Sequence, residues 1–270
     1  MSQSVRAVER ALDILLCFTM ERPTLSLTEI AEQVGMHKST IHRLLATLES
    51  KRFITRDKTT GMYQLGFLFI ELASIMLHDL DVQRWALPFL QKLSLESGET
   101  VDLAILDNDH VVYLQVVESS QRVKIAAAVG EQLPVFCTAT GKAFLAYLPE
   151  DKVHVILAQG LTKYTERTLI SLEDLYKDLH KTRERGFALS EQEYEKDINA
   201  VASPIMDANG CPIAVIAIVG PAYRMSRDRM LTLGQTIRDT CEAIAREVGL
   251  AALPVILPKS TVLCPDENTH

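Results

Sequence analysis

Residues 26–66 read SLTEIAEQVGMHKSTIHRLLATLESKRFITRDKTTGMYQLG, and this stretch predicts a winged helix-turn-helix. Ser26, with Glu29 three residues later, forms a capping box in which each side chain satisfies a backbone amide at the start of a helix. Gly35 is the expected end of that helix, and a tight turn follows. In the next helix the apolar residues are spaced i, i+3, i+4 and i+7, which indicates one buried face made by Ile41, Leu44, Leu45 and Leu48.

The opposite face of this second helix is polar and carries no acidic residue before Glu49. Short hydroxyls and nitrogen donors suit a DNA major groove, where base edges accept hydrogen bonds and phosphates repel carboxylates. We therefore expect contacts with double-stranded operator DNA from the two helices and the hairpin that follows them, through Thr28, Lys38, Ser39, Thr40, His42, Arg43, Thr47, Arg56, Lys58 and Thr59.

The hairpin strengthens this interpretation. Two short strands, 53–56 and 62–65, flank the turn-forming sequence DKTTG. Residues 37–58 contain six Lys and Arg but only two acidic residues, and such a local excess attracts phosphates whatever the base sequence. A helix pair of this kind also occurs in domains that contact only proteins, so a protein-binding module is the alternative.

Length and charge predict two domains. A chain of 270 residues exceeds the usual size of a single domain. The net charge is −7, yet residues 1–78 hold nine basic and eight acidic residues, so the excess of acid lies in the remainder. We expect a DNA-binding domain over 1–66, a linker helix over 67–80, a larger domain over 81–250 and a loose tail over 251–270.

Two helices in the N-terminal part raise the question of a partner. A helix over 5–18 is expected to bury Val5, Val8, Leu12, Leu15 and Leu16. The helix over 66–79, GFLFIELASIMLHD, is apolar almost all round, so it must be covered on several sides. We expect it to pack against a second subunit in a symmetric oligomer; an ordinary core helix of one domain is the alternative.

The larger region alternates strands and helices in an order typical of an α+β domain with a mainly antiparallel sheet. The predicted strands are 100–106, 111–117, 122–128, 187–190, 200–206 and 212–219, and the predicted helices are 82–96, 138–148, 151–159, 172–185 and 227–248.

Several function classes find no support in the sequence. The five cysteines form no CxxC or Cys/His metal spacing, and no phosphate-binding loop or paired-carboxylate signature is present. The longest uncharged apolar stretch is too short to span a membrane, and the N-terminus lacks a signal-peptide pattern. We expect a cytoplasmic protein with no metal, cofactor or membrane contact.

Three stretches in this order resemble the IclR family of bacterial transcriptional regulators. They are SVRAVERALDILLCF with the helix-turn-helix and YQLG, then LESGETVDLAILDNDHVVYLQVVES, then LPVFCTATGKAFLAYLP with RERGFALSEQEYEKDINAVASPIMDANGCPIAVIAIVGP. The resemblance implies a winged-helix domain, a linker helix and a GAF/profilin-like ligand domain. It also implies homodimers that pair through the N-terminal domain, often assembled into tetramers, and a small organic effector that changes operator binding.

A loop that runs into a helix at residues 134–141 is the candidate effector site. Free amides at a helix start favour an anion such as a carboxylate, Thr138 and Thr140 add hydroxyls, and Gly141 permits close approach. Alternatively, Thr138 only caps the helix. By position, the resemblance implies a pocket lined by Phe136, Ala139, Thr140, Ser190, Ile198, Ala200, Ala217 and Val219. Because Ala217 and Val219 stand where relatives that bind the smallest oxoacids have hydroxyls, we expect a monocarboxylate with an apolar or aromatic body.

An enzyme is the rival class. Cys137 directly before a helix start is a position where a thiol pKa can fall. A buried structural cysteine is the commoner case, however, and the candidate bases His110 and His154 are distant in sequence. We expect no catalytic residue.

Overall fold

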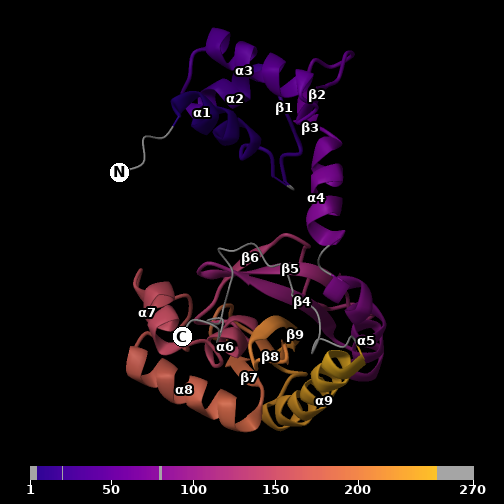
Figure 1. The fold of residues 1–270 in the computed structure, drawn as a ribbon, viewed down its shortest axis with the longest axis vertical. Coiled ribbons are helices and arrows are strands. Elements are labelled where there is room, and N and C mark those ends of the chain that lie inside the picture. Colours follow the sequence, from indigo (N-terminus) through magenta and orange to yellow (C-terminus); the bar gives the residue numbers. More distant parts are fainter. Residues whose placement is uncertain (1–4, 20, 79–80, 248–270) are drawn as a thin grey trace, which may run out of the picture. The chain divides into compact units, whose positions relative to one another are not determined.

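The computed structural model describes residues 5–19, 21–78 and 81–247, which belong to two compact units divided between residues 79 and 80 (Figure 1). The first unit contains α1 (Arg6–Leu15), β1 (Thr24–Leu25), α2 (Leu27–Val34), α3 (Lys38–Ser50), β2 (Ile54–Arg56), β3 (Tyr63–Leu65) and α4 (Leu68–His78). Its three-stranded sheet has β3 in the centre, paired antiparallel to both neighbours. The sequence did not predict β1, because two residues are too few to show an alternating pattern.

The helix-turn-helix forms as predicted. The Ser26 amide donates to Glu29 Oε2 at 2.7 Å, and the Glu29 amide donates to Ser26 Oγ at 3.3 Å, so the capping box is complete. Gly35 ends α2 with φ at +67°, a conformation that costs glycine little. Ile41 and Leu45 are fully buried, which places the predicted face of α3 in the core of this unit.

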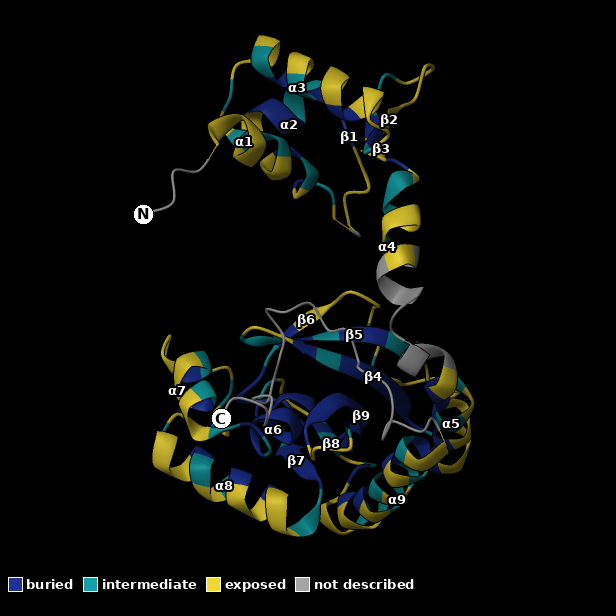
Figure 2. Ribbon diagram, in the orientation of Figure 1, coloured by how far each residue is buried: buried dark blue, intermediate teal, exposed yellow. Residues whose placement is uncertain are grey.

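The predicted inner face of α1 is wrong. Ile14, and Cys17 just beyond the helix, are buried, whereas four of the five residues expected inside are largely exposed (Figure 2). Their exposed fractions are 64% for Val5, 55% for Val8, 53% for Leu12 and 78% for Leu16. The helix has apolar residues on two faces, and periodicity alone does not say which of them packs against α2 and α3. We call these four residues the α1 stripe.

Helix α4 corresponds to the predicted linker helix and belongs by its contacts to the first unit. Its start is tied to the end of α3, because Arg52 forms an ion pair with Glu71. Apolar side chains in its described part are exposed in the single chain. They are Ile70, Leu72 and Ile75, with Phe67 just before the helix.

The second unit is an α+β domain, as predicted. It contains α5 (Asp81–Ser97), β4 (Thr100–Asp107), β5 (His110–Val117), β6 (Gln132–Pro134), α6 (Ala139–Leu145), α7 (Glu150–Leu157), α8 (Leu172–Arg185), β7 (Ala188–Glu191), β8 (Ile198–Met206), β9 (Pro212–Pro221) and α9 (Arg227–Glu247). The sheet order is β6-β5-β4-β9-β8-β7, and every neighbouring pair is antiparallel.

Helices cover both faces of this sheet (Figure 1). Helices α5 and α9 pack side by side on one face, and α6, backed by α8, packs on the other. The second face is built around small cross-strand residues, among them Ala104, Ala202 and Ala217, and the candidate effector site lies on this side.

One predicted strand of this domain is wrong. Residues 122–128 form an irregular segment, and the edge strand of the sheet is β6 instead. A strand was predicted over 122–128 because of its apolar residues, but this segment is not a strand of the sheet. The predicted end of the last helix, at residue 248, and the predicted tail over 251–270 lie outside the described residues.

Candidate functional site

The first candidate surface is the outer face of α3. Lys38, Ser39, His42 and Arg43 are exposed on it. Thr47 is exposed as well, but its hydroxyl donates to the Arg43 carbonyl at 3.0 Å and is therefore engaged within the helix. Thr40 and Thr28 are half-buried. Among the predicted DNA contacts on the helices, these four exposed residues in the first half of α3 are thus the most available.

The hairpin of β2 and β3 forms a structured wing. Asp57 Oδ1 accepts hydrogen bonds from the backbone amides of Thr59 at 2.6 Å and Thr60 at 3.1 Å. These amides stabilise the charged form and lower the pKa of Asp57. Lys58 and Thr59 are exposed at the tip of the hairpin, so two of the residues predicted to contact DNA lie on an ordered turn.

Arg56, the third predicted residue of the wing, is braced against the hairpin itself. Its guanidinium lies 5.4 Å from the centre of the Tyr63 ring, and its Nε donates to the Gly61 carbonyl at 3.3 Å. The side chain stays exposed. An arginine held in this way is oriented before it meets a phosphate, which reduces the entropy lost on binding.

The second candidate site is a cavity in the larger unit, about 590 Å³ including the space open to solvent. It lies between α6 and the sheet face described above. Its walls come from the strands, the start of α6 and two loops: Tyr113, Ile125, Ala126, Ala127, Glu131, Leu133, Thr138, Ala139, Thr140, Ser190, Tyr194, Glu195, Ile198, Ala200 and Val219.

Seven of the ten residues predicted to bind an effector line this cavity: Thr138, Ala139, Thr140, Ser190, Ile198, Ala200 and Val219. Three do not. Phe136 is buried and packs against Tyr164, with ring centres 6.1 Å apart. Gly141 and Ala217 lie behind the wall, in the packing of α6 and in the sheet.

The start of α6 shows why Thr138 and Gly141 are present. The Thr138 hydroxyl donates to the Pro134 carbonyl at 2.8 Å and accepts from the Gly141 amide at 3.1 Å, so Thr138 is the N-cap of the helix. A Cβ atom on Gly141 would lie 2.2 Å from the Cα and the carbonyl oxygen of Val135, so only glycine fits there. Glycine is therefore required at position 141 by the packing of α6 against Val135. The prediction that Gly141 lets a ligand approach closely is wrong.

The sequence missed about half of the cavity wall. Ile125, Ala126 and Ala127 belong to the segment mistaken for a strand. Tyr113 is on β5 and Glu131 immediately precedes β6, and nothing in their local sequence marks them as neighbours of α6. Residues 122–125 alternate polar and apolar side chains as a strand would, so this segment gave no local signal of its irregular course.

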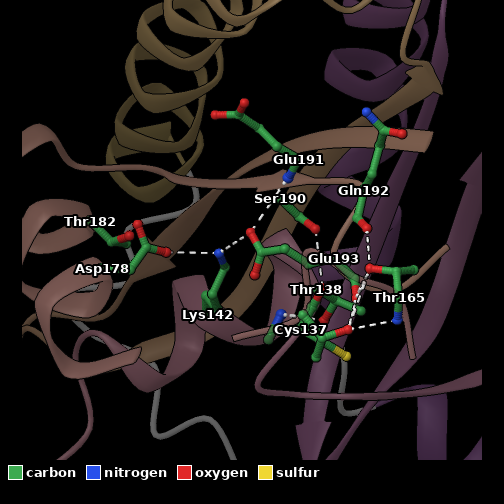
Figure 3. Close-up of polar contacts among 12 residues, drawn as sticks. Cys137, Thr138, Lys142, Thr165, Asp178, Thr182, Ser190, Glu191, Gln192 and Glu193 are labelled. Atoms are coloured by element: carbon green, nitrogen blue, oxygen red, sulfur yellow. Dashed lines mark hydrogen bonds and ion pairs between the residues drawn. The ribbon is translucent and has the colours of Figure 1, made fainter. Parts of the chain in front are cut away.

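A buried ionic network holds the cavity walls together (Figure 3). Lys142 on α6 is 1% exposed, and its Nζ donates to Asp178 Oδ2 on α8 at 2.7 Å and to Glu193 Oε1 at 2.6 Å. The Thr168 hydroxyl donates to the Glu193 carbonyl at 2.6 Å, which ties the loop after β7 to the loop before α8. Burial raises the pKa of Glu193, although Lys142 acts in the opposite direction.

Cys137 does not have the properties of a reactive thiol. It is fully buried, and this burial raises its pKa to about 12, whereas a nucleophilic cysteine needs a lowered value. The two candidate bases are occupied in other contacts. His110 Nδ1 lies 2.9 Å from Asp109 Oδ1, and His154 packs against Tyr176.

The described residues contain neither a candidate metal site nor a candidate membrane-spanning helix. Within 5–19, 21–78 and 81–247, no group of three or more His, Cys, Asp or Glu side chains has the arrangement of a metal site. Over the same residues, no helix is both long and apolar enough to cross a membrane.

A winged helix-turn-helix joined in one chain to an α+β domain with a cavity on one face of its sheet defines a ligand-responsive transcriptional regulator. The comparisons with known proteins agree. Residues 7–58 match the family model described as the IclR helix-turn-helix domain, and residues 74–246 match the model of the bacterial transcriptional regulator IclR C-terminal domain.

The chain belongs to the IclR family of bacterial transcriptional regulators. It is 33% identical over 253 residues to the HTH-type transcriptional repressor AllR of Escherichia coli (strain K12), with 93% of each chain covered. Among solved structures it resembles the Thermotoga maritima IclR, with 30% identity, a TM-score of 0.75 and coverage of 90% of this chain and 98% of that one. Pseudomonas aeruginosa HmgR is similar at 29% identity and a TM-score of 0.72, covering 90% and 99% of the two chains.

Proposed function

We propose that this regulator is a repressor that reads operator DNA with the start of α3, contacts the flanking backbone with the wing, and changes its operator affinity when a small organic acid occupies the cavity. The observation that carries the proposal is the exposed face of Lys38, Ser39, His42 and Arg43 beside the wing. Repression is inferred from the AllR relatives, which are named as repressors. Similarity to DNA-binding repressors argues against the two alternatives, a winged helix that binds only protein and a cysteine-dependent enzyme.

Base reading by Arg43 is tested by substitution. Arg43→Ala should weaken binding to the upstream region of the protein's own gene by about 1–3 kcal/mol and relax the sequence preference, because an arginine commonly donates two hydrogen bonds to a guanine. Fluorescence anisotropy on operator and scrambled duplexes measures both effects. Glu49→Gln, at the far end of α3, is the control and should keep the preference. An Arg43→Ala protein with unchanged operator affinity would exclude this residue from the reading face.

The wing is expected to act through charge alone. Lys58→Ala should weaken operator and scrambled DNA equally, and it should reduce the slope of log affinity against log salt by about one. Lys181→Ala, which removes an exposed lysine from α8 in the other unit, should leave the slope unchanged. Binding that does not depend on salt in any variant would favour the protein-binding alternative.

A dimer is proposed to bring two copies of α3 to one operator. The α1 stripe and the exposed apolar residues of α4 would leave a single copy with an apolar surface of the kind that marks an interface. A two-fold dimer requires a palindromic or nearly palindromic operator, and pairing of two such dimers would give the tetramer that the family resemblance implies.

The effector is proposed to be a monocarboxylate with an apolar or aromatic body. Its carboxylate is placed at the amides of Ala139 and Thr140, because amides in the first turn of a helix have no acceptor within the helix. The body is placed against Ile198, Ala200 and Val219, which supply an apolar wall. Turnover of the bound acid that is lost in Cys137→Ser would support the enzyme alternative instead.

A further inference from the structure

Asp102, on β4, is a buried carboxyl group with no hydrogen-bond partner in the part of the chain that the structure describes. Its side chain is fully buried, and neither carboxylate oxygen has a hydrogen-bond partner among the described residues. A buried polar group that makes no hydrogen bond costs free energy, and an apolar residue at this position would avoid that cost. Such a group calls for an explanation by function.

The sheet register places Asp102 on the cavity side. Across the ladder to β9, Asp102 pairs with Ala217 and Thr100 pairs with Val219. Directly paired residues share a face of a sheet, and so do residues two apart on one strand. Because Val219 lines the cavity, the side chain of Asp102 points to that same face, one residue pair further along.

The electrostatic surroundings of Asp102 are acidic. The charge of Glu131, which lines the cavity, adds to burial in raising the pKa of Asp102 well above its usual value. Asp102 in turn helps to raise the pKa of Tyr113, whose side chain also lines the cavity. Asp102 does not itself line the cavity: like Ala217, with which it pairs, it lies directly behind the wall, within electrostatic range of Glu131 and Tyr113, which line one end of it.

No positive side chain of the described residues balances this end. The charged residues that line the cavity are Glu131 and Glu195, and its described lining includes no Lys, Arg or His. The buried ammonium group of Lys142 is engaged by Asp178 and Glu193. The described lining thus offers Asp102 no cation, and a cationic group on the ligand would supply one.

We propose that Asp102 is a specificity-determining residue of the effector cavity, and that the effector is an organic acid carrying a protonated amine at the end opposite its carboxylate. The ligand's amine donates hydrogen bonds to the carboxylate of Asp102 and is also attracted by the negative charge of Glu131. The ligand's own carboxylate lies at the start of α6. The inference rests on the proposed function, because it concerns the same cavity, and it narrows the effector from a monocarboxylate to an amino acid of the ω-amino type.

Matched ligand pairs that exchange a terminal methyl for an ammonium group test this with the full chain. The pairs are hexanoate with δ-aminovalerate, octanoate with ω-aminoheptanoate, and p-ethylbenzoate with p-(aminomethyl)benzoate, measured by calorimetry. At least one amine should bind the wild type roughly ten- to hundredfold more tightly than its methyl partner, as expected for a charge-assisted hydrogen bond. Asp102→Asn should reduce that preference to within about threefold, whereas Asp107→Asn, an exposed aspartate on the same strand, should retain it.

A preference for the methyl member in every pair, no binding of any amine at millimolar concentration, or an unchanged preference in Asp102→Asn would overturn the inference. Operator binding is measured in parallel. If methyl-bearing acids bind and change operator affinity while the amines do neither, the inference fails and the proposed function stands. If no member of either class binds or affects operator binding, the proposed function itself fails.

The melting temperature of Asp102→Asn without ligand shows whether the variant is folded. The folded-state pKa of Asp102 is raised, so its contribution to stability is complete below its unfolded pKa of about 3.9 and is lost as pH rises through the folded value. Asp102→Asn should therefore match the wild type near pH 4 and melt about 2–4 °C higher at neutral pH. A lower melting temperature at neutral pH would show that Asp102 has a structural partner and would contradict its role as a ligand group.

Discussion

Leu12→Asp should abolish the dimer and weaken operator binding on the order of a hundredfold or more. Leu12 is 53% exposed in the middle of the α1 stripe and contributes little to the core of its own unit. A carboxylate there would be buried without a partner in the dimer interface, at a cost that association does not offset. The loss on DNA is larger than the loss of one contact, because a dimer binds its second half-site at a high effective concentration.

Sedimentation and operator titration of the same sample measure both effects. Leu95→Asp is the matched control, since Leu95 is 84% exposed on α5 in the other unit and the substitution introduces the same charge. It should keep the dimer and the operator affinity. A Leu12→Asp protein that stays dimeric at micromolar concentration would show that the α1 stripe is not the interface.

Lys142→Met should destabilise the larger unit by about 3–5 kcal/mol. The substitution keeps most of the length of the side chain but removes the cation shared by Asp178 and Glu193, and Glu193, almost entirely buried, has no other ion pair among the described residues. Removing one partner of a buried ion pair costs more than the pair contributes, because the remaining charge is not solvated. The walls formed by α6 and by the loop after β7 should loosen together.

Urea unfolding followed by tryptophan fluorescence tests this, because the single tryptophan, Trp85, lies on α5 in the larger unit. Adding Glu193→Gln to Lys142→Met should restore much of the loss, since Asp178 keeps its ion pair with Arg185 and no uncompensated buried carboxylate then remains. Lys177→Met on α8 removes a lysine whose ion pairs are exposed, and it should cost less than about 1 kcal/mol. A loss as small as this in Lys142→Met itself would contradict the role of the network.

Local sequence signals predicted the parts of the fold that local interactions determine. The capping box at Ser26 and the left-handed turn at Gly35 each fix a structure within one helical turn. The i, i+3, i+4, i+7 spacing of apolar residues fixes the buried face of the single helix α3. The two-residue turn Asn108–Asp109 similarly fixed the pairing of β4 with β5. Two errors arose where the outcome depends on distant partners. The choice between two apolar faces of α1 is one, and the irregular course of residues 122–128 is the other.

The candidate cavity shows the same division. Residues at the start of α6 and on β7, β8 and β9 were found together, because the family resemblance aligns them. Tyr113 and Glu131 reach the site only through the sheet order, with β5 and β6 at its edge, and no local pattern encodes that order. Asp102 was missed because a single aspartate in an apolar strand shows its lack of a partner only after folding.

The central claim is that occupancy of the cavity changes operator affinity, and one linked titration tests it. The tightest-binding acid from the matched pairs is added at saturation, and the affinity of the full chain for its upstream DNA is measured by anisotropy. We predict a change of roughly 5- to 150-fold, with operator DNA changing the acid's affinity by the same factor in calorimetry. An operator affinity that stays constant while calorimetry shows the cavity to be occupied would contradict the account.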